Sequence, residues 1–403
     1  MKPTDPHARS IPWTAVGIAD AGPGAPLVVH VVDTLAAAQA EHGLLNLISH
    51  LPPERYRHAI VCMKDRGDYR GDLRARGVDV VHVDRGARAP QLPCFVRLFG
   101  ILRALRPDLI HTRDGTGLPA QVVAALAGVR LRVHGEHGRG AVHPGTSLLR
   151  RVMCPMIDHF VAASADLEHW LVDAVGAPPG RVSQIANGVD SVLFHPRLGP
   201  AAAVGPQGFM HDGAFVIGSV GPMDEAGNHT SLVDAFLRLI ASPHPAHARL
   251  RLLIVGDGPA RSECQALLRR AGAATRAWLP GARADVPQLL RAMDLYVQPA
   301  LAPDRSHAIL QAMATGLPVV AAAVGANTEL VHAGFTGILV PPLGTALLAS
   351  AISDYCRIPD MALRHGARAR SQVLARHSLP AMARDYLAIY DALTRGDQDG
   401  AEC

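Results

Sequence analysis

The chain has 403 residues, of which 49% are hydrophobic and 18% are charged, with a formal net charge of +4. This composition excludes a disordered chain, and the length exceeds what one ordinary core supports, so we expect two domains. The mild positive charge, without basic clusters interleaved with stacking aromatics, gives no indication of nucleic-acid binding.

Cysteine and histidine usage predicts neither a metal site nor a disulfide framework. The six cysteines are scattered without a C-x-x-C spacing, and the 21 histidines include no H-E-x-x-H pattern. No run of about 18 apolar residues occurs. The first 26 residues, rich in proline and small residues, do not resemble a signal peptide. We therefore expect a cytoplasmic protein with a flexible tail over residues 1–26.

Short apolar runs alternate with helical patterns from residue 27 onward. The runs are rich in β-branched residues, as in buried strands. Strands are expected at 25–33, 58–63, 78–83, 108–112 and 131–137. Strands that alternate with helices of this length predict right-handed βαβ crossovers and a parallel sheet covered on both faces. We expect one such domain over 27–195.

The segment PRLGPAAAVGPQGFMHD, residues 196–212, interrupts this rhythm with Gly, Pro and Ala, which is typical of a linker. The alternation then restarts and predicts a second parallel-sheet domain over 213–375. A helix over 376–395 is expected to pack back on the N-terminal domain, before a disordered tail over 396–403. Two such domains place a ligand cleft at the carboxyl edges of their strands.

Several segments, in order along the chain, resemble the running signature of retaining glycosyltransferases of family 4. They are IANGVDSVLFHP, VGDGPARSE, AWLPGARADVPQLLRAMDLYVQPA, GLPVVAAAVGANTELV and GFTGILVPP. The resemblance implies the GT-B fold, an α/β architecture of two Rossmann-like parallel-sheet domains that face each other across a cleft. LPPERYRHAIVC, LRPDLIHTR and LRVHGEHGRG are most similar to sugar transferases associated with PEP-CTERM exopolysaccharide systems.

The same resemblance implies a nucleotide-sugar donor and a growing exopolysaccharide or lipid-linked glycan as acceptor, with no metal or other cofactor. The diphosphate leaving group gains charge as the sugar bond breaks, so cations and hydrogen-bond donors aimed at it lower the barrier. The family is expected to supply an arginine and a lysine after the first strand of the second domain. It also supplies two glutamates, separated by seven residues, after the strand DLYVQPA.

This chain departs from the family pattern at each of these four positions. Pro222 stands at the arginine position and Gly227 at the lysine position, while Pro303 and Gln311 stand at the glutamate positions. Losing one such contact would cost about 3 kcal/mol of transition-state stabilisation. Two interpretations stay open: a transferase with a strongly altered donor pocket, and a catalytically inactive pseudoenzyme that binds a glycan or a partner transferase on the same scaffold.

Polar residues near these positions could compensate for the missing groups. Arg305 and Ser306 lie at an expected helix start, where backbone amides and the helix dipole favour an anion. The alternative is that they are ordinary polar residues of an exposed loop, with Ser306 as an N-cap. The donor-binding candidates are Gly221, Asn228, His229, Gly256, Asp257, Asp304, Arg305, Ser306, His307 and Gln311.

The N-terminal domain offers further candidates at its strand ends. HGEHG places Glu136 and His137, the catalytic candidates, just after a strand, where an imidazole near a carboxylate can orient an acceptor hydroxyl or handle its proton. A purely structural role at a strand end is an equally good interpretation. The acceptor-binding candidates are Glu41, which matches an acidic position of the family, His111, His134 and Arg113, a potential phosphate contact.

Two segments combine apolar residues with arginines. FVRLFGILRALRP and SLLRRVMCPMI could let the N-terminal domain rest on an anionic membrane beside a lipid-linked acceptor, at the inner face of the membrane. Core-facing helices with a solvated basic side are the alternative interpretation. The arginines concerned are Arg97, Arg103, Arg106, Arg150 and Arg151.

Overall fold

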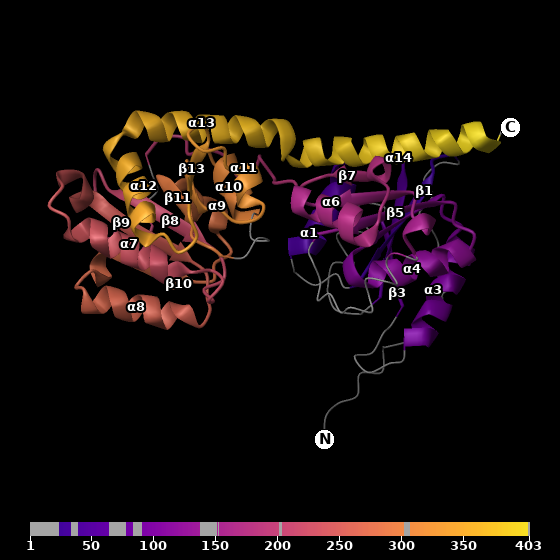
Figure 1. The fold of residues 1–403 in the computed structure, drawn as a ribbon, viewed down its shortest axis with the longest axis horizontal. Helices are drawn as coiled ribbons and strands as arrows, with labels where there is room; N and C mark the ends of the chain where they lie inside the picture. Colours follow the sequence, from indigo (N-terminus) through magenta and orange to yellow (C-terminus); the bar gives the residue numbers. More distant parts are fainter. Residues whose placement is uncertain are drawn as a thin grey trace, which may run out of the picture. The chain divides into compact units, whose positions relative to one another are not determined.

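The chain folds into two compact units. The first comprises Met1–Ala186 together with Met382–Cys403, and the second comprises Asn187–Ala381. Both are built from parallel strands and helices, which confirms the predicted α/β class (Figure 1). The computed structural model describes residues 24–33, 39–63, 78–83, 91–137, 151, 153–200, 204–301 and 307–401.

The first unit contains a seven-stranded parallel sheet with the order β3-β2-β1-β4-β5-β6-β7. The order runs outward from β1 in two directions, as in doubly wound Rossmann-like domains. Its strands are β1 (Leu27–Val32), β2 (Arg57–Cys62), β3 (Asp79–His82), β4 (Leu109–Arg113), β5 (Leu131–Glu136), β6 (His159–Ala162) and β7 (Val182–Gln184).

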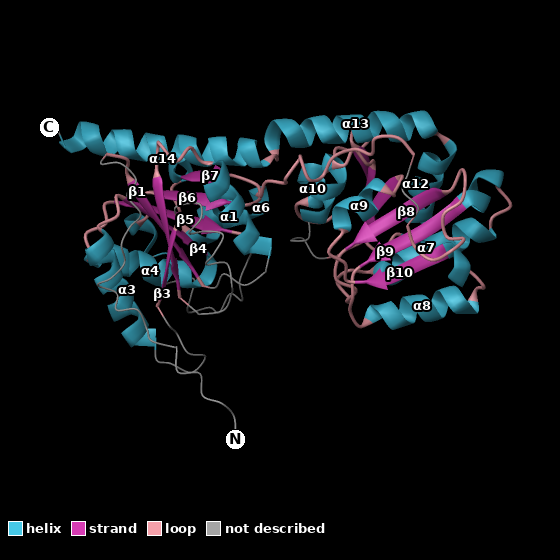
Figure 2. Ribbon diagram, turned by 180° about the vertical axis from the view of Figure 1, so that it is seen from behind, coloured by secondary structure: helices cyan, strands magenta, loops and turns pink. Residues whose placement is uncertain are grey.

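Helices cover both faces of this sheet (Figure 2). They are α1 (Gln39–His50), α3 (Gln91–Leu105), α4 (Asp114–Leu126), α6 (Ala165–Trp170) and α14 (Leu379–Ala401), with short helical turns at Cys154–Met156, Leu171–Val175 and Pro179–Arg181. Successive strand side chains point to opposite faces. Accordingly, Val29 of β1 packs with Leu98 of α3 and Val123 of α4, whereas Val32 packs with Leu44 of α1.

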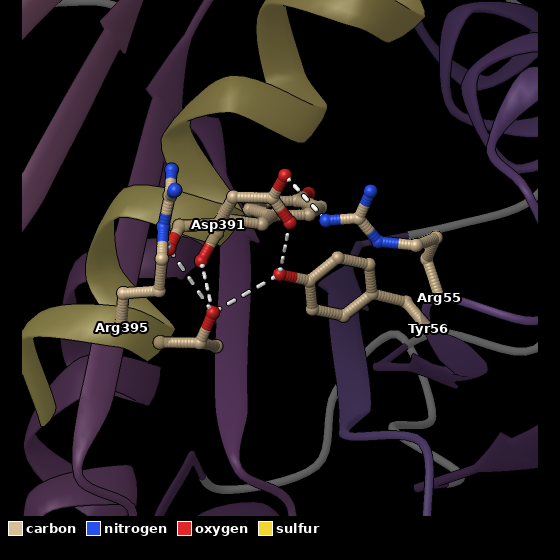
Figure 3. Close-up of polar contacts among 6 residues, drawn as sticks. Arg55, Tyr56, Asp391 and Arg395 are labelled. Carbon is tan, nitrogen blue, oxygen red and sulfur yellow. Dashed lines mark hydrogen bonds and ion pairs between the residues drawn. The ribbon is translucent and has the colours of Figure 1, made fainter. Parts of the chain in front are cut away.

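The C-terminal helix α14 is attached to the start of β2 by a polar cluster (Figure 3). The carboxylate of Asp391 accepts a hydrogen bond from the Tyr56 hydroxyl at 2.9 Å and pairs with the Arg55 guanidinium at 2.7 Å. The Tyr56 hydroxyl also meets Thr394 Oγ1 at 3.2 Å. Burial raises the pKa of Tyr56 to about 12, so this phenol stays protonated and keeps donating at neutral pH.

The second unit contains a six-stranded parallel sheet with the order β10-β9-β8-β11-β12-β13. Its strands are β8 (Phe215–Val220), β9 (Leu250–Val255), β10 (Ala277–Gly281), β11 (Leu295–Gln298), β12 (Val319–Ala322) and β13 (Gly337–Val340). Its helices are α7 (His229–Ala241), α8 (Ala260–Arg270), α9 (Val286–Arg291), α10 (His307–Ala314), α11 (Asn327–Leu330), α12 (Thr345–Arg357) and α13 (Pro359–Arg376), with short turns at Pro245–Arg249 and Ala274–Arg276.

Two apolar cores sandwich the second sheet. Ile217 of β8 packs with Phe236 of α7 on one face, and the next side chain toward the amino end, Val216, packs with residues such as Ile309 of α10 on the other. The four central strands, β9, β8, β11 and β12, are therefore buried on both sides. This double burial is why they read in the sequence as continuous apolar runs instead of alternating ones.

The division between the units falls at residues 186–187, earlier than the linker expected at 196–212. The Val189 N–H donates to the His377 carbonyl oxygen at 2.8 Å, and Val189 bridges Ser378 in parallel. Val189 and Phe194 are buried in the core of the second unit. A segment that follows the last strand of the first sheet therefore packs with the second. At the chain end, α14 runs to Ala401, past residue 395, where the helix was expected to end.

Helix α13 approaches the turn before β12 at a residue without a side chain. A Cβ at Gly366 would collide with the carbonyl oxygen of Gly316. By contrast, a Cβ at Gly396, in the exposed part of α14, would meet nothing within 4 Å. Both glycines lie in helices, so alanine has the same intrinsic helix preference at either position. Comparing the two alanine substitutions therefore isolates the steric cost at Gly366.

We expect Gly366→Ala to destabilise the second unit by about 1–3 kcal/mol, because a backbone oxygen occupies the space that the methyl group needs. Gly396→Ala is the matched control and should stabilise α14 by up to about 1 kcal/mol, since alanine is the better helix former. Thermal unfolding of the two variants beside the parent chain measures both shifts. A stabilising Gly366→Ala would contradict this account of the α13 contact.

Candidate functional site

The candidate residues of the first unit lie at the carboxyl ends of two neighbouring strands. Arg113 is the last residue of β4, Glu136 is the last residue of β5, and His137 follows directly. The strands are parallel, with Arg113 opposite Gly135. The structure therefore brings these candidates to one edge of the sheet, the edge at which doubly wound folds bind their ligands.

Glu136 ends a buried chain of hydrogen bonds. Gln121 Nε2 donates to Thr112 Oγ1 at 2.9 Å, Thr112 Oγ1 meets His134 Nδ1 at 2.8 Å, and His134 Nε2 meets Glu136 Oε1 at 3.3 Å. All four side chains are buried. Because the amide donates to Thr112, the hydroxyl can donate to Nδ1 of His134, and the Nε2–H of the same ring then points at the carboxylate.

Helix α4 approaches this chain closely because Gly117 has no side chain. A Cβ at Gly117 would lie 2.8 Å from His134 Cε1. The Gln121 amide on the same helix reaches past Thr112 to donate a second hydrogen bond to the Val133 carbonyl oxygen at 2.8 Å. The ring of His134 is thus fixed by its packing and by both of its nitrogens.

The opposite face of the first sheet carries a row of histidines, of which His30 of β1 and His111 of β4 are buried and His58 of β2 is half-buried. His30 Nε2 meets His58 Nδ1 at 3.1 Å, His111 Nδ1 meets the Tyr390 hydroxyl of α14 at 2.7 Å, and the rings of His30 and His111 lie 5.4 Å apart. Burial lowers the pKa of His30 and of His111 well below the usual value, and that of His58 to about 4. All three imidazoles are therefore neutral at pH 7.

His137 lies toward this second face, beside His111. A Cβ at Gly135 would lie 3.1 Å from His137 Cε1 and 3.3 Å from His111 Nε2, so only glycine leaves room for both rings. His111 is 0% exposed, whereas His137 is half-buried. The two catalytic candidates therefore lie on opposite faces of the sheet. Glu136 is hydrogen-bonded to the buried His134 on one face, whereas the side chain of His137 is partly exposed on the other.

In the second unit, the loops that follow β8 and β9 cross at glycines. The Met223 N–H donates to the Asp257 carbonyl oxygen at 2.9 Å. A Cβ at Gly256 would collide with the carbonyl oxygen of Gly221, and one at Gly258 would lie 2.5 Å from that of Met223. Gly256 and Gly258 also have φ values of 151° and 150°, which favour glycine.

The exposed Asp257 stabilises the β9 loop locally. Its Oδ1 accepts the Gly258 N–H at 2.8 Å and its Oδ2 pairs with Arg261 Nη1 at 3.4 Å. Arg261 in turn donates to the Leu279 carbonyl oxygen at 2.9 Å. The candidate carboxylate therefore joins the β9 loop to α8 and, through Arg261, to β10.

The loop after β8 forms a tight turn at the two positions where the family pattern expects cations. Asp224 Oδ1 accepts the Gly227 N–H at 2.8 Å. A Cβ at Gly227 would collide with the carbonyl oxygen of Pro222. The backbone of this turn, as well as the residue types, therefore leaves no room for a lysine at position 227.

Asn228 and His229 have partners within the second unit. Asn228 adopts a left-handed conformation (φ 51°), its Nδ2 donates to the Pro299 carbonyl oxygen at 3.1 Å, and its Oδ1 accepts from Ser231 at 2.7 Å. The ring of His229 is 3% exposed, and its Nε2 meets Ser219 Oγ of β8 at 3.2 Å. Asn228 thus ties α7 to the segment after β11, and His229 packs back against β8.

The remaining donor candidates are only partly described. His307 and Gln311 lie one turn apart on α10, and both are half-buried. Asp304, Arg305 and Ser306 lie outside the described residues. Glu41 lies on α1, but its side chain is likewise outside the description.

Within the described part of the chain, no three His, Cys, Asp or Glu side chains converge in a group that could hold a metal ion. Over the same residues, no helix combines the length and apolar character needed to cross a bilayer.

Sequence reasoning missed four residues of the two networks that surround the candidates: Thr112 and Gln121 on one face of the first sheet, and His30 and His58 on the other. A usable signal was present. VVHVV and RHAIVC each carry a histidine within an apolar run, and a polar residue in a buried strand requires a hydrogen-bond partner. The period of two along each strand would then have sorted these residues by face.

Two family models match the chain in the order of its units. The model described as glycosyltransferase family 4 matches residues 40–192, and the model described as glycosyl transferases group 1 matches residues 214–357.

Individual proteins of known name are similar over most of the chain. The D-inositol 3-phosphate glycosyltransferase 1 of Catenulispora acidiphila is 30% identical over 310 residues, 71% of this chain and 72% of that protein. The UDP-Gal:alpha-D-GlcNAc-diphosphoundecaprenol alpha-1,3-galactosyltransferase of Escherichia coli is 26% identical over 303 residues, 72% of this chain and 77% of that protein.

A solved structure shares the fold. The crystal structure of Anabaena Alr3699/HepE in complex with UDP matches with a TM-score of 0.74 at 20% identity, and the match covers 91% of this chain and 100% of that one. At this identity the likeness supports the two-unit GT-B fold alone. The fold predicted from the sequence is confirmed.

We expect the stability of the first unit to fall on acidification. His30, His58 and His111 have lowered pKa values in the folded state, so the unfolded chain takes up their protons first. Their contribution is complete above pH 6.5 and falls as the pH drops below it, for His58 down to a pH of about 4, at about 1.4 kcal/mol per pH unit for that histidine. Unfolding midpoints measured across this range should show His58→Gln with a shallower slope than the parent, and the exposed-site control His50→Gln with an unchanged one. Equal slopes for His58→Gln and the parent would contradict the assignment.

Proposed function

The chain belongs to the glycosyltransferases of group 1 and family 4, and we propose that it transfers a hexose with retention from a nucleotide-sugar to a glycan or lipid-linked acceptor. The half-buried His137, seated on Gly135 at the carboxyl end of β5, carries this proposal. Its exposed part can meet an acceptor hydroxyl at the edge where such folds bind ligands. Arg113, at the end of β4, is the candidate contact for an acceptor phosphate.

In the proposed reaction, the bond between the sugar C1 and the donor phosphate breaks and the nucleoside diphosphate leaves. The acceptor oxygen forms the new bond to C1 on the same face of the sugar, and its proton is lost. His137 orients the hydroxyl or receives that proton, and the proposal needs no metal ion. The Thr112–His134–Glu136 chain is proposed to hold the end of β5 in register, since fixed supporting residues keep a reacting group in place.

We propose that the donor pocket is strongly altered. Pro222 and the closed turn at Gly227 supply no cation, so the diphosphate would rely on backbone amides at the start of α7, on Asn228 and on Arg305. Gln311 would hydrogen-bond a sugar hydroxyl where a glutamate is expected. His307, Asp304 and Ser306 complete the proposed contacts.

A second candidate function rests on the turn at Gly227. A loop that admits no side chain where a phosphate-binding lysine is expected favours a pseudo-glycosyltransferase, which binds a glycan or a partner transferase without turnover. Donor binding separates the two candidates, since only the transferase needs it.

The acceptor is proposed to be lipid-linked or part of a growing exopolysaccharide of the PEP-CTERM type. The E. coli relative is named for a diphosphoundecaprenol-linked acceptor, which supports the first possibility. A cytoplasmic protein with peripheral contact at the inner face of the membrane would meet such an acceptor.

Calorimetric titration with UDP, GDP, ADP and their common sugar derivatives tests the donor proposal first. We expect one nucleotide to bind at micromolar strength, about −8 kcal/mol. Arg305→Ala should abolish that binding, because its guanidinium replaces a missing cation, whereas the exposed-arginine control Arg269→Ala should retain it. No heat at millimolar nucleotide would reject the transferase and favour the scaffold function.

His137→Ala should lower the rate of sugar transfer by about 10²- to 10⁴-fold, the usual contribution of a positioned acid or base. Nucleotide affinity should not change, since the residue lies in the first unit and is assigned to the acceptor. The assay follows transfer from the nucleotide-sugar found by titration to a diphosphoundecaprenol-linked sugar, with the exposed His169→Ala as control. An equal fall in His137→Ala and His169→Ala would remove His137 from the reaction.

A further inference from the structure

We propose that one end of the first unit is a docking surface for an anionic lipid bilayer, formed by the outer face of α3 and an arginine-lined pocket that receives a lipid phosphate. The inference depends on the proposed function in one respect only: the lipid-linked acceptor proposed there gives the protein a reason to dock on a membrane. Its physical basis is that α3 buries one apolar face against the first sheet and exposes a second apolar face.

Helix α3 is apolar on both sides. Leu98 and Leu102 are buried against the first sheet, as expected of a helix that covers it. Leu92 and Val96 are nevertheless 73% and 64% exposed, and Phe99 is 39% exposed. The outer face of a soluble helix is normally polar, so this stripe calls for an apolar partner.

The stripe leads to a basic end. At about 100° per residue, Leu92, Val96, Phe99 and Arg103 project within about 60° of one another along the helix. Arg103 Nη1 lies 4.0 Å from the Cβ position of Gly128, at the end of α4. Close to it along α4, Leu126 is 73% exposed and extends the apolar surface.

A cavity of about 340 Å³ opens at this end. Asp108 directly precedes β4 and Arg130 directly precedes β5, so the cavity lies at the amino ends of these strands, away from Arg113 and His137. It is therefore separate from the candidate transfer site. Its polar lining consists of Arg103, Arg106, Asp108, Arg130 and Asp397.

The charge balance of the cavity favours an anion. Asp397 pairs with Arg130 at 3.2 Å, and Asp108 accepts the Leu27 N–H at 2.7 Å. Among the described residues, the guanidinium groups of Arg103 and Arg106 make no hydrogen bond or ion pair. Two arginines are thus left to bind a phosphate, the group that the planar guanidinium fits best.

The backbone at Arg106 adds to this argument. Arg106 directly follows α3 with φ 47°, and its N–H donates to the Leu102 carbonyl oxygen at 2.9 Å. A left-handed residue after a helix is usually glycine, which adopts this conformation without steric cost. An arginine here accepts strain while placing its side chain at the cavity.

A bilayer surface explains both features together. Its acyl boundary accepts the Leu92, Val96 and Phe99 stripe, and its phosphates meet Arg103 and Arg106. A free phosphate would use the pocket and leave the apolar stripe exposed.

Flotation of the full chain with phosphatidylcholine vesicles, prepared with and without phosphatidylglycerol, tests the proposal. We expect binding only to the anionic vesicles, with loss at high salt. Leu92→Ser with Val96→Ser, and separately Arg103→Gln with Arg106→Gln, should each weaken binding by about 10- to 30-fold. Leu363→Ser, at a 72% exposed position of α13, and Arg269→Gln with Arg270→Gln on α8 are the matched controls and should bind as the parent does.

Thermal unfolding shows whether each variant is folded, and the nucleotide titration reports the proposed function separately. No binding of the parent to anionic vesicles overturns the inference while leaving donor binding untouched. Equal binding by the α3 variants and the controls overturns it as well. Stabilisation by inorganic phosphate without vesicle binding would show a free-anion site instead of a docking surface.

Discussion

A parallel sheet covered on both faces gives a polar side chain no access to water, and this constraint governs the first unit. The central strands β1, β4 and β5 each bury a histidine, and a buried histidine requires a partner. The structure meets the requirement separately on the two faces. On one face, Gln121 and Thr112 position His134 against Glu136. On the other, α14 supplies Tyr390 to His111. What a ligand meets at the sheet edge depends on these two interior networks.

In the second unit, close contacts between backbone atoms constrain the sheet edge in a similar way. The β8 and β9 loops approach so closely that glycine is required at positions 256 and 258, and the turn at Gly227 closes on Pro222. Asp224, Asn228 and Asp257 each stabilise a loop or a helix end. In the proposed function, such an edge would bind the donor diphosphate mainly through amides and helix ends, so donor affinity decides between the two candidate functions.

The sequence was sufficient for the fold because apolar runs alternate regularly with helical patterns, and the position of Arg113, Glu136 and His137 at strand ends followed from the same alternation. Their partners did not follow. Glu136 and His137 are adjacent in sequence and point to opposite faces, as the period of two along a strand predicts, but the residues that each one meets depend on the strand register. The closed turn at Gly227 and the packing of Val189 beside Ser378 depend on contacts between distant segments, which local pattern cannot encode.

The attachment of α14 to the first unit has a consequence for synthesis. The tyrosine and aspartate that complete this unit, Tyr390 and Asp391, are made only after all of residues 187–381. At about 5–20 residues per second, the ribosome needs roughly 10–40 s for that stretch. During this interval the nascent first sheet lacks its last helix, and His111 and Tyr56 await their partners. The second unit has all of its own strands and helices in one continuous segment, so the unit that begins the chain is the later one to be completed.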